Sequence, residues 1–150
     1  MLTKEYLKNI LSELQQVTCI NEQLFEANGY DGVIEVLNNL RGIEFPCFVI
    51  EKKNSGVFQI IEGALDTYTQ SLWIMGQIER DEEEKNTSQL LDEMFHLMCD
   101  VIRLIIRDDL SGVLPGVDLS HISYNKRMGG PKCRGYEINL TFNDNISLVI

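Results

Sequence analysis

The feature that most constrains this chain is a wide apolar stripe between residues 87 and 108. Its members recur with the spacing of three and four that places side chains on one face of an α-helix: Leu90, Leu91, Met94, Phe95, Met98, Val101, Ile102, Ile105 and Ile106. The other face carries mainly Asp92, Asp100, Arg103 and Arg107. A stripe this wide predicts a helix that lies across another layer of structure and ends near Asp108. Asn86 or Thr87 is its expected N-cap.

The layer beneath this helix is predicted to be an antiparallel β-sheet. Residues 136–143 form the clearest strand, because four apolar residues alternate with polar ones: Tyr136, Ile138, Leu140 and Phe142. Residues 117–124 are a further strand candidate. Residues 146–150 either pair back against the sheet or extend as a tail.

The middle of the chain supplies the other expected strands. Residues 45–52, FPCFVIEK, are rich in β-branched and aromatic side chains, which favour strands. The turn signal Asn-Ser-Gly at 54–56 predicts that residues 57–62 return antiparallel beside them. A long strand is expected at residues 67–78, with Trp73 as a core anchor.

The N-terminal region reads as helical. Thr3 is a good N-cap for an amphipathic helix that fades near residues 18–20. The apolar positions of this helix are Tyr6, Leu7, Ile10, Leu11, Leu14 and Val17. A second helical piece is expected at residues 22–27, stopped by Asn-Gly at 28–29, and a third at 31–41.

These elements predict an α+β fold in one domain. The chain of 150 residues has the commonest length of a single domain. We expect residues 1–41 to form an N-terminal helical segment. Residues 42–150 are expected to form an antiparallel sheet packed by the long helix.

Composition narrows the functions that this chain can have. Its net charge of −10 disfavours binding to nucleic acid and to anionic membranes. The cysteines lack the close spacing of zinc or redox motifs, and Cys19, Cys47 and Cys99 lie among apolar neighbours, which predicts buried thiols. We expect no signal peptide and no transmembrane segment, because no apolar run is long enough for either.

No catalytic or metal-binding motif is complete in this sequence. Glu93, His96 and Asp100 share one side of the long helix, but a di-iron site needs a second such motif. His121 lies near serines without the G-x-S-x-G elbow of a hydrolase. The glycine-rich segment 128–132 lacks the spacing of a phosphate-binding loop. We therefore predict no enzyme activity, no cofactor and no bound metal.

Two charged segments are candidates for a subunit or partner interface. The first is an acidic connection that includes Glu79, Asp81, Glu82, Glu83 and Glu84. The second lies in residues 125–135, which read as a loop by their glycines and proline; it carries Lys126, Arg127, Lys132 and Arg134. Both segments are also explained as ordinary solvated connections. The sharper hypothesis is a mobile basic arm that docks on an acidic surface.

The order of these elements resembles the tail-terminator and tail-completion proteins of tailed bacteriophages. The resemblance rests on FPCFVIEK at 45–52, the long strand with its charged exit at 67–84, the helix at 90–106 and the closing strand at 135–142. It implies a ring, commonly a hexamer, that ends tail-tube growth and joins tail to head. The implied partners are other copies of the chain and other tail or neck proteins, in the virion or in the host cytoplasm during assembly.

Other functions stay open from the sequence. The chain also fits a small cytoplasmic adaptor or regulatory domain. A subunit of a contractile injection machine related to phage tails is a further alternative. An enzyme whose site does not show in the sequence is the remaining alternative.

Overall fold

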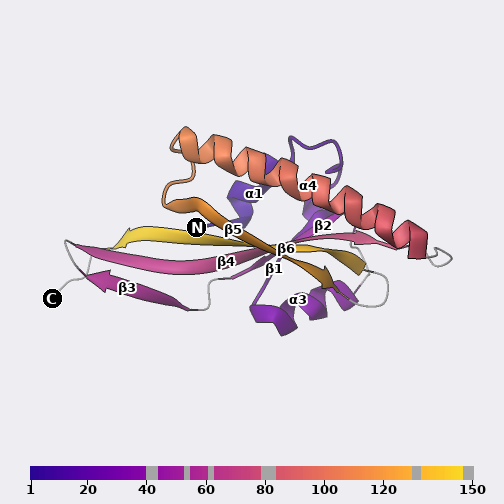
Figure 1. The fold of residues 1–150 in the computed structure, drawn as a ribbon, viewed down its shortest axis with the longest axis horizontal. Coiled ribbons are helices and arrows are strands. Elements are labelled where there is room, and N and C mark those ends of the chain that lie inside the picture. Colours follow the sequence, from indigo (N-terminus) through magenta and orange to yellow (C-terminus); the bar gives the residue numbers. More distant parts are fainter. Residues whose placement is uncertain (40–43, 53–54, 61–62, 79–83, 130–132, 147–150) are drawn as a thin grey trace.

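The computed structural model describes residues 1–39, 44–52, 55–60, 63–78, 84–129 and 133–146, and it is an α+β fold (Figure 1). The helices are α1 (Lys4–Leu11), α2 (Ile20–Gln23), α3 (Gly29–Asn38) and α4 (Glu84–Leu110). The strands are β1 (Leu24–Ala27), β2 (Cys47–Glu51), β3 (Gly56–Ile60), β4 (Ala64–Gln77), β5 (Val117–Met128) and β6 (Cys133–Ile146). They form one six-stranded sheet in the order β1-β2-β4-β6-β5, with β3 paired to β4. The predicted fold class is confirmed.

The two longest strands, β4 and β6, form the centre of the sheet. They pair antiparallel from Ala64↔Ile146 to Gln77↔Cys133. On one face this pairing brings buried apolar side chains together, as in the stacked rings of Tyr68 and Phe142, whose centroids are 5.6 Å apart. The other face is polar toward one end, where Ser71 Oγ donates to Asn139 Oδ1 at 2.6 Å. The alternation predicted for residues 136–143 is thus confirmed.

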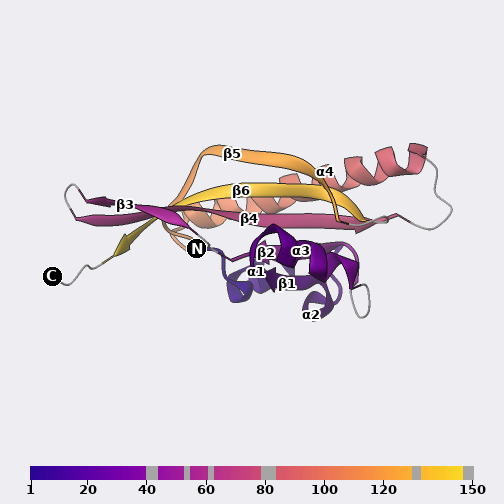
Figure 2. The ribbon, with the colours of Figure 1, turned by 90° about the horizontal axis from the view of Figure 1, so that it is seen from below.

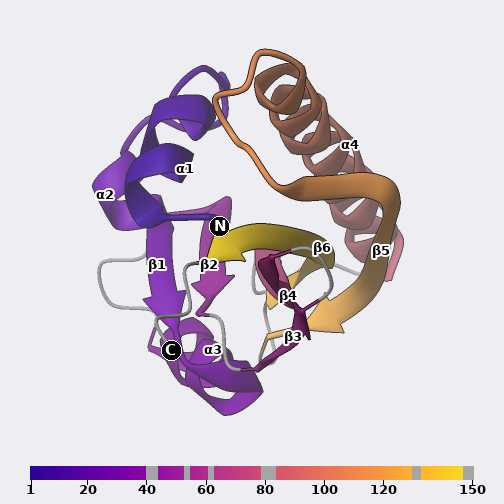
Figure 3. The same ribbon diagram turned by 90° about the vertical axis from the view of Figure 1, so that its left-hand side faces the viewer.

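Helices α1 and α4 cover the apolar face of the sheet, and α3 lies on the opposite face (Figure 3). The buried residues of α4 are Met94, Leu97, Met98, Val101 and Ile105. The predicted N-cap at Asn86 or Thr87 is wrong, because the helix already begins at Glu84. Glu and Lys are good helix formers, so the helix extends past both capping candidates. In the described part of the chain, no helix has the combination of length and apolar character needed to cross a membrane.

The N-terminal region contributes a strand that sequence reasoning missed. Thr3 does cap α1, with Tyr6 N–H donating to its Oγ1 at 3.0 Å, but the helix ends at Leu11. The helix expected at residues 22–27 is confirmed only for Glu22 and Gln23, which end α2; residues 24–27 form β1 instead, which pairs parallel with β2. The sheet is therefore mixed. Parallel neighbours need a crossover, and α3 supplies it; this helix was predicted at 31–41, of which 40 and 41 lie outside the described residues.

Strand β3 does not pair as expected. The hairpin predicted between residues 45–52 and 57–62 is wrong, since β3 pairs antiparallel with β4 from Gly56↔Tyr68 to Ile60↔Ala64. Strand β2 has β1 and β4 as its neighbours, so both of its edges are occupied. Gly63 has a φ of +123°, which suits the tight connection between β3 and β4.

The predicted loop at residues 125–135 is also mostly strand. Strand β5 continues to Met128 and β6 begins at Cys133, with Lys126 paired to Tyr136 across them. Long-range pairing with β6 outweighs the local loop signal of the glycines and the proline. Residues 147–150, for which pairing or a tail was expected, lie outside the described residues.

The cysteines differ from one another in burial. Cys47 is buried as predicted, Cys99 is half-buried, and Cys19 is exposed, which corrects the expectation for that residue. Cys133 is buried too, and burial raises the pKa of its thiol to about 12. All four thiols are free.

Candidate interaction surface

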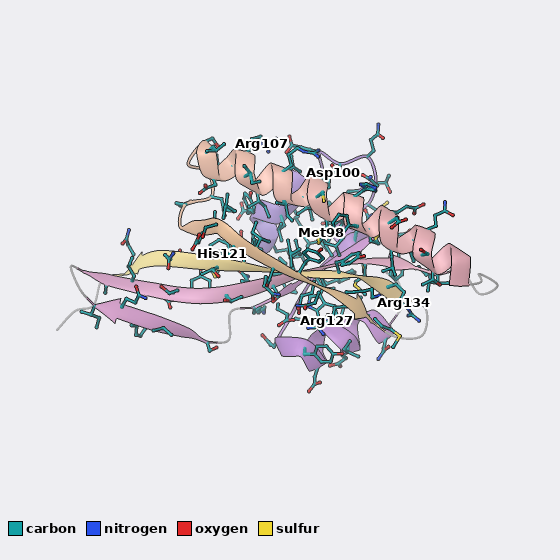
Figure 4. The ribbon with its side chains drawn as sticks, in the orientation of Figure 1. Met98, Asp100, Arg107, His121, Arg127 and Arg134 are labelled. Carbon is teal, nitrogen blue, oxygen red and sulfur yellow. The ribbon has the colours of Figure 1, made fainter. Side chains whose placement is uncertain are left out.

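The basic residues proposed for an interface lie mainly on paired strands. Lys126 and Arg127 are at the end of β5, and Arg134 lies opposite Met128 on β6. Figure 4 shows Arg127 and Arg134 near the same end of the sheet. Lys132 lies outside the described residues. The expected mobile basic arm is corrected for Lys126, Arg127 and Arg134, because the antiparallel pairing of β5 with β6 holds their backbones.

The acidic half of the predicted interface lies mostly beyond the described residues. Glu79, Asp81, Glu82 and Glu83 belong to that part of the chain, and Glu84 opens α4. The predicted contact between the acidic and basic segments therefore falls mostly on residues outside the described part of the chain.

Arg127 is part of a polar and aromatic cluster on the α3 face of the sheet. Its guanidinium carbon lies 5.7 Å from the ring centroid of Trp73 and 5.9 Å from that of Tyr30. Its Nη2 donates to Oε1 of the buried Glu137 at 3.2 Å. Its Nε is also buried, and no acceptor reaches it among the described residues. The cluster joins β5 to α3 and to the centre of the sheet.

A second carboxylate completes this cluster. Trp73 Nε1 donates to Glu51 Oε1 at 2.7 Å. Burial is the main cause that raises the pKa of Glu51; the hydrogen bond from Trp73 opposes it, and the charge of Glu137 adds to it. The ionisable groups of Arg127, Glu137 and Glu51 interact with one another inside the cluster. The cluster is therefore suited to holding the strands in position.

Strand β3 is the most exposed apolar element of the fold. All of its residues are exposed, and Val57, Phe58 and Ile60 keep 62%, 61% and 68% of their surface accessible. Figure 2 shows β3, the start of β4 and the end of β6 extending beyond the helices, and we call this part the β3 arm. Exposed apolar side chains on an edge strand are typical of surfaces that another chain covers.

A surface groove runs between β1 and α3. Its volume is about 610 Å³, and its lining includes Phe25 and Val36 together with the carboxylates of Glu26, Asp31 and Glu35. Strand β1 is the outer strand on this side of the sheet. The groove thus combines an outer strand with a negative lining.

The histidines considered for chemistry lie at the surface. His96 is exposed on α4, and His121 is exposed on β5. Near His121, Ser120 N–H donates to Asp118 Oδ1 at 3.0 Å, and the hydrogen bonds from Ser120 lower the pKa of Asp118. Among the residues that the structure describes, no three His, Cys, Asp or Glu side chains are grouped so that they could hold a metal ion.

Sequence reasoning missed both the β3 arm and the groove. An exposed apolar strand has the same composition as a buried one, so the sequence of β3 does not indicate whether the strand is exposed. The groove depends on β1, which was expected to be helical. A comparison with protein-family models found no match, and a comparison with curated proteins found none.

Proposed function

We propose that this chain is a structural assembly protein of the tail-terminator type, which associates with copies of itself into a ring at the end of a tail tube. The observation that carries the proposal is the exposed β3 arm. The element order resembles that of tail-terminator and tail-completion proteins, and this resemblance is the reason for proposing a ring at the end of a tail tube. Other tail or neck proteins are the proposed further partners.

The β3 arm supports association through its apolar side chains. Fully burying one Val, Ile or Phe side chain contributes roughly 1.5–3 kcal/mol. Val57, Phe58 and Ile60 therefore offer a substantial part of an interface once a neighbour covers them. The outer edge of β3 also presents backbone groups that can pair with a further strand.

The ionisable groups support a structural role over a catalytic one. Arg127, Glu137 and Glu51 contact one another or the neighbouring aromatic rings. Catalytic sites instead direct such groups toward an open pocket that a substrate can enter. The net charge of −10 favours protein partners over nucleic acid.

Self-association of the purified chain tests this proposal. Light scattering after gel filtration and native mass spectrometry are expected to show a closed oligomer, and negative-stain images are expected to show rings. Replacing the apolar residues of the β3 arm by serine (Val57→Ser, Phe58→Ser and Ile60→Ser) should weaken the assembly strongly. Leu110→Ser is the matched control, because Leu110 is 82% exposed but lies at the end of α4. A chain that stays monomeric at the highest concentrations reached would contradict the proposal.

A further inference from the structure

The two outer strands of the main path through the sheet lie on opposite sides of the molecule. The strand order β1-β2-β4-β6-β5 places β1 at one edge and β5 at the other, as Figure 2 shows. Among the described residues, each has a strand neighbour on one side only. The outward side of an edge strand presents backbone N–H and C=O groups that can pair with another chain.

The β5 edge is basic. From Leu119 to Met128 the strand contains no Asp or Glu, although the whole chain has 23 acidic residues. Lys126 is exposed on this edge, between Tyr124 and Met128, which are 52% and 59% exposed. Residues two apart on a strand share a face, so a lysine with an apolar residue on each side is presented to a neighbour.

The β1 edge has the complementary character. The groove beside it is lined by Glu26, Asp31 and Glu35, and its lining contains no Lys or Arg. Phe25 and Val36 add apolar surface within the same groove. Glu26 Oε2 forms an ion pair with Lys52 Nζ at a distance of 3.5 Å. Asp31 and Glu35 are exposed on α3.

The faces of the two edges also agree. Consecutive residues on a strand point to opposite faces, so Lys126 and Arg127 give β5 one cation on each face. On β1, Leu24 belongs to the core under α1 and α4, whereas Ala27 belongs to the core under α3. Glu26 therefore lies on the α1 and α4 face, while Asp31 and Glu35 stand on α3 at the other face. Lys126 thus lies on the face of β5 that corresponds to the face of Glu26 on β1, whereas Arg127 is held within its own chain by Glu137 and the rings of Trp73 and Tyr30.

We infer that copies of this chain associate head to tail, with the β5 edge of one copy seated in the acidic groove beside β1 of the next. The occupant of the groove is thus a second copy, because its β5 edge carries Lys126 beside apolar side chains and so complements the groove in charge and in apolar content. The contact joins two different surfaces on opposite sides of the molecule, so it repeats from copy to copy and yields a ring or a filament. This inference rests on the proposed self-assembly and names the surfaces that carry it.

Charged, apolar and backbone contacts contribute differently to this interface. Exposed ion pairs contribute little affinity individually, but complementary charge sets the orientation of partners and raises the association rate. The neighbouring copy covers apolar surface of Tyr124 and Met128 on β5 and of Phe25 and Val36 beside the groove, and this burial supplies most of the affinity. Pairing of the backbone edges fixes the register.

A charge-exchange experiment tests the inference. The β5-edge variant is Lys126→Glu, and the groove variant carries Glu26→Lys and Glu35→Lys, one on each face. Each alone is expected to raise the apparent dissociation constant of self-association by about tenfold or more. Mixing the two variants should restore assembly, because the altered edge of one then meets the altered groove of the other. Arg103→Glu on the outer face of α4 is the matched control and should assemble as the wild type does.

The outcomes separate this inference from the proposed function. If the wild type does not self-associate, the proposed function itself fails. If the wild type assembles, and either variant assembles equally well or the mixture fails to recover, the head-to-tail contact is overturned while self-assembly stands. Circular dichroism checks that the variants fold. Should Lys126→Glu not fold, Lys126→Gln replaces it, with a smaller loss expected.

Discussion

The guanidinium of Arg127 lies over the ring of Trp73, with 5.7 Å between the guanidinium carbon and the ring centroid. Trp73 is fully buried at the centre of the sheet, and Arg127 is close to the end of the edge strand β5. The contact therefore fastens the outer strand to the core. It also keeps the neighbouring Lys126 on the β5 edge that we propose as an interface.

Removing this contact is expected to loosen β5. Arg127→Ala should lower the free energy of unfolding by about 2–4 kcal/mol, because it removes a stacked cation and leaves Glu137 buried without it. Arg127→Lys should recover only part of the loss, since an ammonium does not reproduce the planar guanidinium. Urea unfolding at low protein concentration measures both. The exposed neighbour Lys126→Ala should change stability by less than about 0.5 kcal/mol; equal losses for the two alanine variants would show that the contact contributes nothing.

The raised pKa of Glu51 predicts a specific pH dependence. The carboxyl group of Glu51 therefore binds its proton more tightly in the folded protein than in the unfolded chain. Stability from this group is thus fully present below the carboxyl pKa of the unfolded chain and is lost as pH rises through the higher pKa of the folded state. Glu51→Gln stays neutral and keeps an acceptor for Trp73 Nε1, so its stability should decrease less over the same range. Urea unfolding at a series of pH values compares the two proteins; parallel profiles would be evidence against this role of Glu51.

The N-terminal helix is tied to the end of α4 by one hydrogen bond. Tyr6 Oη donates to Oδ2 of the buried Asp108 at 2.7 Å. Tyr6→Phe removes the donor and leaves the ring, so we expect a loss of about 1–3 kcal/mol. Tyr124→Phe, at an exposed ring on β5, is the control. Thermal unfolding followed by circular dichroism measures the difference, and an unchanged melting temperature for Tyr6→Phe would contradict the prediction.

Two glycines should respond to alanine with opposite signs. A Cβ at Gly135 would overlap the backbone oxygen of Ile74, so Gly135→Ala must displace β4 or β6 and should cost about 1–3 kcal/mol or more. At Gly32, within α3, the nearest atom to a new Cβ is 3.5 Å away. Gly32→Ala should therefore stabilise the protein by about 0.5–1 kcal/mol, because alanine favours the helix. Denaturant unfolding of both variants measures the contrast, and losses of similar size would argue against this packing.

Salt should distinguish the two proposed contributions to assembly. Raising the ionic strength screens exposed charges. The effect of Lys126→Glu on self-association should therefore shrink as salt is added, whereas the effect of the serine substitutions in the β3 arm should persist. Analytical ultracentrifugation across a salt series measures both. A loss from Lys126→Glu that does not depend on salt would mean that this substitution acts through packing or folding instead.

Several elements followed from short-range patterns alone. The stripe from Leu90 to Ile106 predicted α4, and Thr3 predicted the start of α1. The alternation from Tyr136 to Phe142 predicted β6, with its apolar face turned to the core. These features depend on spacings of two to four residues, so neighbouring letters contain the information.

By itself, the sequence determined the α+β class, the long helix, the central strands and the burial of Trp73. Only the tertiary structure decided that residues 24–27 form a strand and that β3 pairs with β4 and is exposed. It also decided that Arg127, which was predicted to lie in a loop, is on a strand and contacts the ring of Trp73. Each of these depends on a partner far away in the chain. Distant segments compete for the same pairing positions, and this competition decides whether an apolar strand is covered and which strands of the described sheet lie at its edges.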